Sequence, residues 1–92
     1  MSDVSRLIER LKDLSAMLEK FDTDVEDDFM ALDSAWSRLD AAWDGVAYQE
    51  FVQKWQQTRG MFREYTGLAY KYELFLRERI EALQKFERSG GF

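Results

Sequence analysis

The chain contains no cysteine, no histidine and no proline among its 92 residues, and each absence excludes a type of chemistry or structure. Without a thiol or an imidazole there is no cysteine nucleophile, no disulfide, no histidine base and no zinc site of the usual nitrogen and sulfur kind. We therefore expect a protein that is not an enzyme and that needs no cofactor or metal. The lack of proline, with glycine only at positions 45, 60, 67, 90 and 91, favours long helices.

The residues that are present indicate one soluble folded unit. Hydrophobic residues make up 46% and charged residues 34% of the chain, which is too apolar for a disordered tail and too charged for a membrane span. The first residues are polar and lead directly into an amphipathic pattern, so we expect no cleaved signal peptide. The net charge of −5, without a basic patch, disfavours nucleic acid, stable membrane insertion and a membrane-active toxin.

Apolar residues recur at steps of three and four along the first half, which predicts an amphipathic helix over about residues 3–41. The first seam position is always aliphatic, at Val4, Leu11, Leu18, Val25, Leu32 and Leu39. The second seam position carries Leu7, Leu14, Phe21, Asp28, Ala35 and Ala42. A flanking column with Ile8, Phe29, Trp36 and Trp43 widens the apolar stripe. Ser2 or Asp3 can cap the start of this helix.

The second half repeats the heptad with larger side chains, which predicts a helix over about residues 47–88 and a short tail at 89–92. Its seam carries Tyr48, Phe51, Trp55, Thr58, Phe62, Tyr65, Ala69, Tyr72, Leu76, Arg79, Leu83 and Phe86, and its flanking column carries Met61, Leu68 and Phe75. The turn falls at residues 42–46, where Gly45 frees the backbone and the charge of Asp44 favours the start of the next helix.

Two long helices with a short connection predict an all-α fold, an antiparallel helical hairpin. A hairpin covers only one seam, whereas both helices carry wider apolar stripes. We therefore expect two chains to pair into a dimeric four-helix bundle. The residues expected at the partner interface are large and apolar or aromatic: Phe29, Trp36, Trp43, Tyr48, Trp55, Met61, Phe62 and Phe75.

The turn Trp43-Asp44-Gly45, at the centre of a chain of this size, resembles the motif of the WXG family of small type VII (ESX-like) secretion substrates, also called early secreted antigen-like proteins. Leu39 precedes the motif, and Ala47 and Phe51 follow it, with the spacing of the family. The resemblance implies a bacterial protein secreted without a cleaved signal peptide. It implies action through protein–protein interaction, as a homodimer or a heterodimer with a second WXG-type chain. A secretion ATPase and a larger exported toxin are further implied partners.

One element of the family is missing from this sequence. Members, or one member of a pair, often carry a Tyr followed four residues later by Asp or Glu just beyond the second helix, as part of the export signal. Here the residues at that spacing after Tyr65, Tyr70 and Tyr72 are uncharged, namely Ala69, Leu74 and Leu76. The alternative interpretation is a cytosolic adaptor or chaperone that docks on the helical hairpin of a larger type VII-exported toxin.

Charge is uneven between the halves, since residues 1–46 hold 5 basic and 12 acidic side chains and residues 47–92 hold 8 and 6. Facing positions in the hairpin place Asp24 and Asp28 near Arg63 and Arg59. We favour weak surface ion pairs here. The alternative is that Asp28, within an otherwise apolar seam, pairs with Arg59 or Arg63 and fixes the register at a cost in stability.

Trp43 also has two interpretations. It packs against the start of the second helix, near Val46 or Tyr48, or it reaches a partner chain, and we favour the first. Gly60 and Gly67 lie away from the seam, and they mark either tolerated surface positions or the close approach of another helix.

Overall fold

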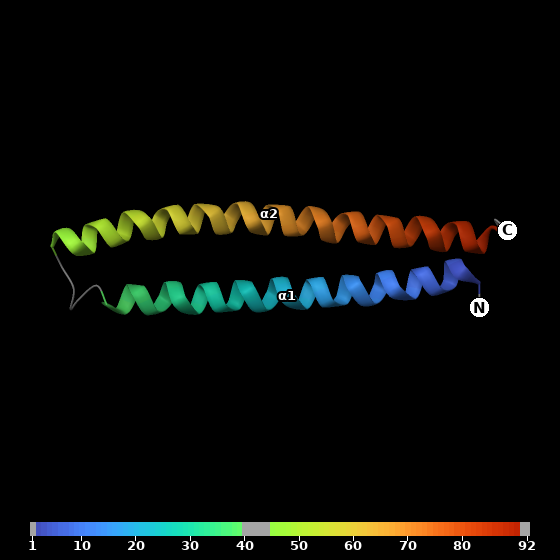
Figure 1. The fold of residues 1–92 in the computed structure, drawn as a ribbon, viewed down its shortest axis with the longest axis horizontal. Helices are drawn as coiled ribbons and strands as arrows, with labels where there is room; N and C mark the ends of the chain where they lie inside the picture. The colour runs from blue at the N-terminus through green and yellow to red at the C-terminus, as the bar shows by residue number, and fades with distance from the viewer. Residues whose placement is uncertain (1, 40–44, 91–92) are drawn as a thin grey trace.

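The computed structural model describes residues 2–39 and 45–90, and within these ranges the chain forms two helices and no strand. Helix α1 spans Asp3–Leu39 and helix α2 spans Val46–Arg88. The helices lie side by side in opposite directions, so that the start of α1 and the end of α2 meet at one end of a rod (Figure 1). The rod measures 68 × 16 × 13 Å. The expected all-α helical hairpin is confirmed.

Local signals account for the helix ends. Ser2 caps α1, because its Oγ accepts a hydrogen bond from the Ser5 N–H at 3.1 Å. Gly45 precedes α2 with a φ of +88°, a conformation that favours glycine. At the other end of α2 the Ser89 N–H donates to the Lys85 carbonyl, and Gly90 has a φ of +71°. Trp43 and Asp44 lie outside the described residues.

The contact between the helices uses two of the three apolar columns of α1. The aliphatic column at Val4, Leu11, Leu18 and Val25 is partly buried in the seam, as expected, whereas Leu32 of the same column is 50% exposed and the prediction is wrong there. The second column in the seam is the flanking one, in which Ile8 is 5% exposed. The column that we expected there faces outward, with Leu7, Leu14 and Phe21 exposed to 44–56%.

Aromatic residues near the turn explain this choice of column. Phe29 and Trp36 belong to the column of Ile8, and both pack on aromatic rings of α2. A heptad column keeps its direction along a pair of coiled helices. Seating Phe29 and Trp36 between the helices therefore also seats Ile8, and it turns the column of Leu14 toward solvent.

Helix α2 shows the same rotation in the half away from the turn. From Ala69 onward the expected seam residues Tyr72, Arg79 and Phe86 are exposed, and the residues that follow them are buried or partly buried instead, namely Glu73, Ile80 and Glu87. The buried residues of the described chain are few, at 5–9% exposure: Ile8, Ala69 and Ile80. A rod of two helices has no second layer, so most of its seam stays partly exposed.

Candidate functional site

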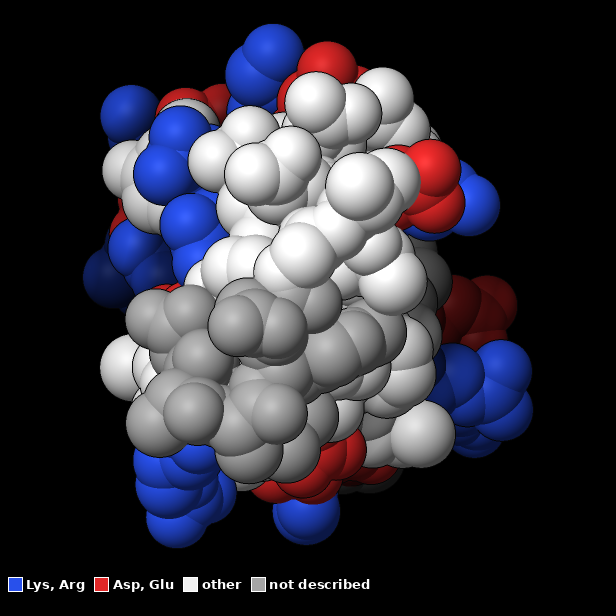
Figure 2. Space-filling view, turned by 90° about the vertical axis from the view of Figure 1, so that its left-hand side faces the viewer, with Lys and Arg blue, Asp and Glu red and all other residues white. Residues whose placement is uncertain are grey.

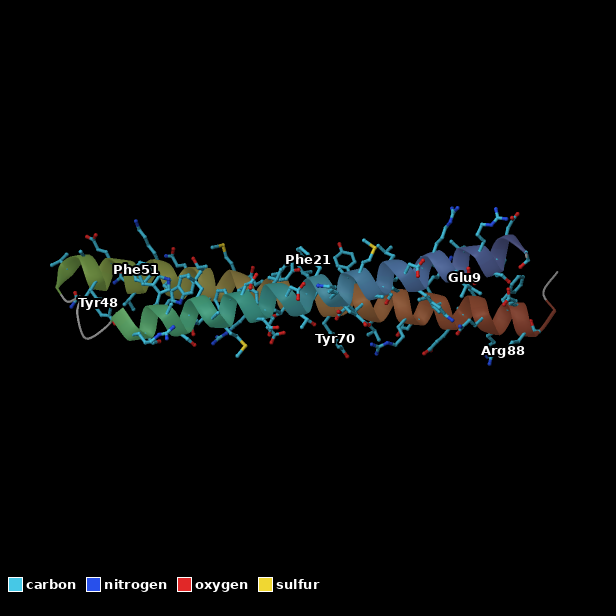
Figure 3. All side chains as sticks on the ribbon, turned by 90° about the horizontal axis from the view of Figure 1, so that it is seen from below. Glu9, Phe21, Tyr48, Phe51, Tyr70 and Arg88 are labelled. Carbon is cyan, nitrogen blue, oxygen red and sulfur yellow. The ribbon has the colours of Figure 1, made fainter. Side chains whose placement is uncertain are left out.

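Aromatic side chains from both helices pack together in the half of the rod next to the turn. Phe29 lies nearly parallel to two rings of α2, with its centroid 4.1 Å from Phe62 and 5.3 Å from Trp55. Trp36 packs on Phe51 at a centroid distance of 3.6 Å, and Phe51 lies close to the turn (Figure 3). Ring pairs of this kind stabilise beyond the area that they bury. This aromatic cluster therefore joins the two helices near the turn.

Asp33 connects the aromatic cluster to a charge on α2. Its Oδ1 accepts hydrogen bonds from Trp55 Nε1 at 2.7 Å and from Arg59 at 2.6 Å. The bond from Trp55, followed by that from Arg59, lowers the pKa of the Asp33 carboxyl. The alternative in which Asp28 pairs with Arg59 or Arg63 is wrong, because Asp28 belongs to the outward-facing column and is exposed, and Arg59 binds Asp33 instead. Asp24 binds Lys20 on its own helix, at 2.8 Å.

A second carboxylate, Asp22, lies in the middle of the seam. The Tyr65 hydroxyl donates to its Oδ1 at 2.8 Å, whereas its buried Oδ2 has no hydrogen-bond partner among the described residues. Partial burial, and then the neighbouring Asp22, raise the pKa of the Glu73 carboxyl. The hydrogen bond to Asp22 raises the pKa of the Tyr65 hydroxyl. The place of Glu73 in the seam, beside Asp22, therefore disfavours the charged form of the Glu73 carboxyl.

Polar contacts join the helices at the end of the rod opposite the turn. The Ser5 hydroxyl donates to the Glu87 carboxylate across the seam. Further along, an Arg77 nitrogen lies 3.9 Å from a Glu19 oxygen, and both side chains are more than half exposed. Exposed ion pairs of this kind contribute at most about 1 kcal/mol.

An apolar groove lies open between the helices, from the middle of the rod toward the end opposite the turn. Its lining consists of Leu14, Leu18, Leu68, Lys71, Tyr72, Phe75 and Leu76. Four of these side chains are 51–63% exposed: Leu14, Leu68, Tyr72 and Phe75. We call the side of the rod that carries this groove the groove face. A contiguous exposed apolar surface rimmed by charge is typical of an interaction site.

The opposite side of the rod is more polar. Its hollow near the middle is lined by Asp22, Thr23, Glu26, Tyr65, Thr66, Ala69, Tyr70 and Glu73. Phe21, one heptad after Leu14, and Tyr70 project to opposite sides of the rod (Figure 3). Seen from the turn end, uncharged side chains occupy the upper middle of the view and charged ones lie around its edge (Figure 2). Apolar exposure is therefore concentrated on the groove face.

The residues expected at a partner interface fall into three groups. Phe29, Trp36, Tyr48, Trp55 and Phe62 are partly buried within the hairpin. Met61 and Phe75 are each 62% exposed, and Trp43 lies outside the described residues. Their role toward a partner stays a prediction. Leu14 and Tyr72, which were expected in the seam, line the groove instead. The signal for it was the third apolar column, which exceeds what one neighbouring helix covers.

Other kinds of site find no support in the described part of the chain. No group of three or more acidic side chains there is placed to hold a metal ion. Neither α1 nor α2 is long and apolar enough to cross a membrane. No family model, no curated protein and no solved structure matches this chain.

Proposed function

We propose that this protein is a non-enzymatic interaction protein whose hairpin completes a four-helix bundle with a partner hairpin. The observation that carries the proposal is the groove face, where large apolar side chains remain more than half exposed. A hairpin usually obtains a full core when two further helices cover such a surface.

The finer proposal is that the bundle is a WXG-type substrate of a type VII secretion system, or the dimeric partner of such a substrate. Its support is the Trp43-Asp44-Gly45 motif, which ends one residue before α2 begins at Val46. A hairpin with two helices of 37 and 43 residues is compatible with this proposal.

The second candidate is a cytosolic adaptor for a larger exported toxin. It is favoured by Tyr65, Tyr70 and Tyr72, none of which is followed after four residues by an acidic side chain. The same groove face would then cover the hairpin of the toxin.

Light scattering over a dilution series, with circular dichroism on the same samples, tests the interaction proposal. We expect a helical species heavier than one chain, alone or after co-expression with the products of neighbouring genes. A chain that is fully helical, monomeric and unbound to any of these products would contradict the proposal. Appearance in the culture medium that depends on the secretion ATPase separates the two candidates, because an adaptor stays in the cells.

A further inference from the structure

A regular column of polar residues runs along α2 beside the groove. Every seventh residue from position 50 is exposed and charged or polar: Glu50, Gln57, Glu64, Lys71, Glu78 and Lys85. Heptad spacing places these residues on one side of the helix. Lys71 lines the groove itself. The column therefore forms a charged border along the groove face.

This column is complementary to itself when it is read backwards. In two antiparallel copies of one helix, residues that face each other have position numbers with a constant sum. A sum of 135 gives three pairs, each occurring twice by two-fold symmetry: Glu64 with Lys71, Glu50 with Lys85, and Gln57 with Glu78. The centre falls between residues 67 and 68, at the middle of α2 (Val46–Arg88). The two copies of α2 then overlap along their whole length.

The parallel order, with both turns at the same end, brings like charges together instead. In this order α1 of one chain lies on α2 of the other, and the facing residues have the same position sum as Phe29 and Phe62, which face each other within the hairpin. With this sum the outer border of α1 meets that of α2 in four like-charged pairs: Arg6 with Lys85, Asp13 with Glu78, Lys20 with Lys71, and Asp27 with Glu64. Like charges across an interface oppose association. The charge pattern therefore selects the antiparallel order.

We propose that the groove face binds a second copy of this chain, with the two hairpins antiparallel and Leu68 beside the two-fold axis. The inference rests on the proposed function and names the partner. Apolar side chains follow nearly the same register, one residue away, since Leu68 with Leu68 of the second copy and Met61 with its Phe75 each have a position sum of 136. Helix α1 contributes less to the specificity of the pairing, because Asp24 and Asp28 lie on the groove side of both copies and carry like charges.

Charge reversal on the border of α2 tests this pairing. Glu64→Lys and Lys71→Glu each place like charges opposite one another twice in a homodimer, so each variant alone should dimerise roughly tenfold more weakly. Mixed together, the two variants carry opposite charges at both positions and should pair as tightly as the unchanged chain. Arg63→Glu is the control, because Arg63 lies one heptad before Tyr70, on the opposite side of the rod.

Sedimentation equilibrium gives the dissociation constants, native mass spectrometry identifies the mixed dimer, and circular dichroism shows that each variant is helical. Single variants that dimerise like the unchanged chain, or a mixture that pairs no better than its components, would overturn the inference. A chain that is monomeric alone but binds another protein would also overturn it, and it would leave the proposed function standing.

The order of the hairpins has its own measurement, because the chain has no native cysteine. A spin label on Gln49→Cys, near the turn, reports the distance between the two copies. At 1.5 Å per residue from the centre of α2, the antiparallel order predicts about 50–60 Å. The parallel order predicts about 20–30 Å from the spacing of packed helices. A single short distance would rule out the antiparallel dimer.

Discussion

The half of the rod next to the turn and the half that carries the outer helix ends are held together by different side chains. Near the turn, Phe29 of α1 stacks on two rings of α2 at centroid distances of 4.1 and 5.3 Å, and Asp33 accepts hydrogen bonds from both Trp55 and Arg59. In the other half the seam combines aliphatic residues with the polar side chains of Ser15, Glu73 and Glu87. The turn half packs partly buried aromatic residues within one chain, whereas the outer half buries Ile8 and Ile80 and leaves further apolar residues on the groove face.

This difference separates folding from association within one hairpin. The aromatic cluster decides which column of α1 enters the seam, and so it decides which column is left for a partner. Side chains that stabilise the hairpin and side chains that recruit a second chain are therefore different residues, and substitutions can test the two roles separately.

The largest effect is expected from Trp55→Ala. This change removes three ring contacts and a hydrogen bond to Asp33. We expect the free energy of unfolding to fall by about 3 kcal/mol. Ile80→Ala, in the outer half, should cost about 2 kcal/mol. Urea denaturation followed by circular dichroism, at one protein concentration, measures both. An equal or larger loss for Ile80→Ala would contradict the expectation that the turn half contributes more to the free energy of unfolding than the outer half.

Phe75→Ser should affect association and not the hairpin. Phe75 is 62% exposed in the single chain, so its loss leaves the seam intact. Within a buried interface the Phe75 ring is expected to contribute about 2 kcal/mol to the free energy of association, so its loss should change the dissociation constant roughly 30-fold. Tyr70→Ser is the matched control, since Tyr70 is 63% exposed on the opposite side. Equal weakening by both variants, measured by sedimentation, would mean that the groove face has no special role.

Gly67→Ala should stabilise α2 without changing association. A Cβ at Gly67 meets no atom within 4 Å, and the residue lies inside the helix. Alanine in place of glycine stabilises a helix by up to about 1 kcal/mol. Thermal unfolding measures the gain, and Gly60→Ala is a second site of the same kind. Loss of the dimer in either variant would instead indicate that another helix packs closely against these glycines.

Glu73→Gln is expected to give the smallest effect, and it depends on pH. The pKa of Glu73 is raised above 4.5 in the folded chain, so protonation favours folding. The stability from the protonated form is fully present below pH 4.5 and is lost as the pH rises through the folded pKa. The variant should raise Tm by a few degrees at pH 7 and leave it unchanged near pH 4.

Asp33→Asn provides the control of opposite sign. The pKa of Asp33 is lowered, so its contribution is present at neutral pH and disappears as the pH falls through the folded pKa. A lower Tm for Glu73→Gln at pH 7 would show that the ionised Glu73 stabilises the seam.

The hairpin itself followed from the sequence, because missing proline and sustained heptads leave little besides two long helices. Which columns face each other did not follow. The sequence offered three apolar columns in α1, and only the stacking of Phe29 and Trp36 on the rings of α2 separates them. The role of Asp33 was missed for the same reason, since its position faces Trp55 only after this choice is made.

The sequence predicted that an apolar surface would remain uncovered, because the apolar stripes are wider than one seam. It did not predict which residues would form that surface. Met61 and Phe75 were expected at a partner surface and are exposed. Leu14 and Tyr72 were assigned to the seam and belong to the groove. Periodicity gives the number of apolar columns, but the rotation of each helix about its axis depends on contacts between residues far apart in the sequence.

The contact between Ser5 and Glu87 has a consequence for anything attached to the chain. It holds the first turn of α1 against the last turn of α2, so both helices leave the rod at one pole (Figure 1). A passenger joined near either terminus therefore departs from the same pole of a rod 68 Å long, clear of the aromatic pole. A single hairpin therefore carries attached domains at one end only. An antiparallel pair of hairpins carries one attached domain at each end and holds the two domains about one rod length apart.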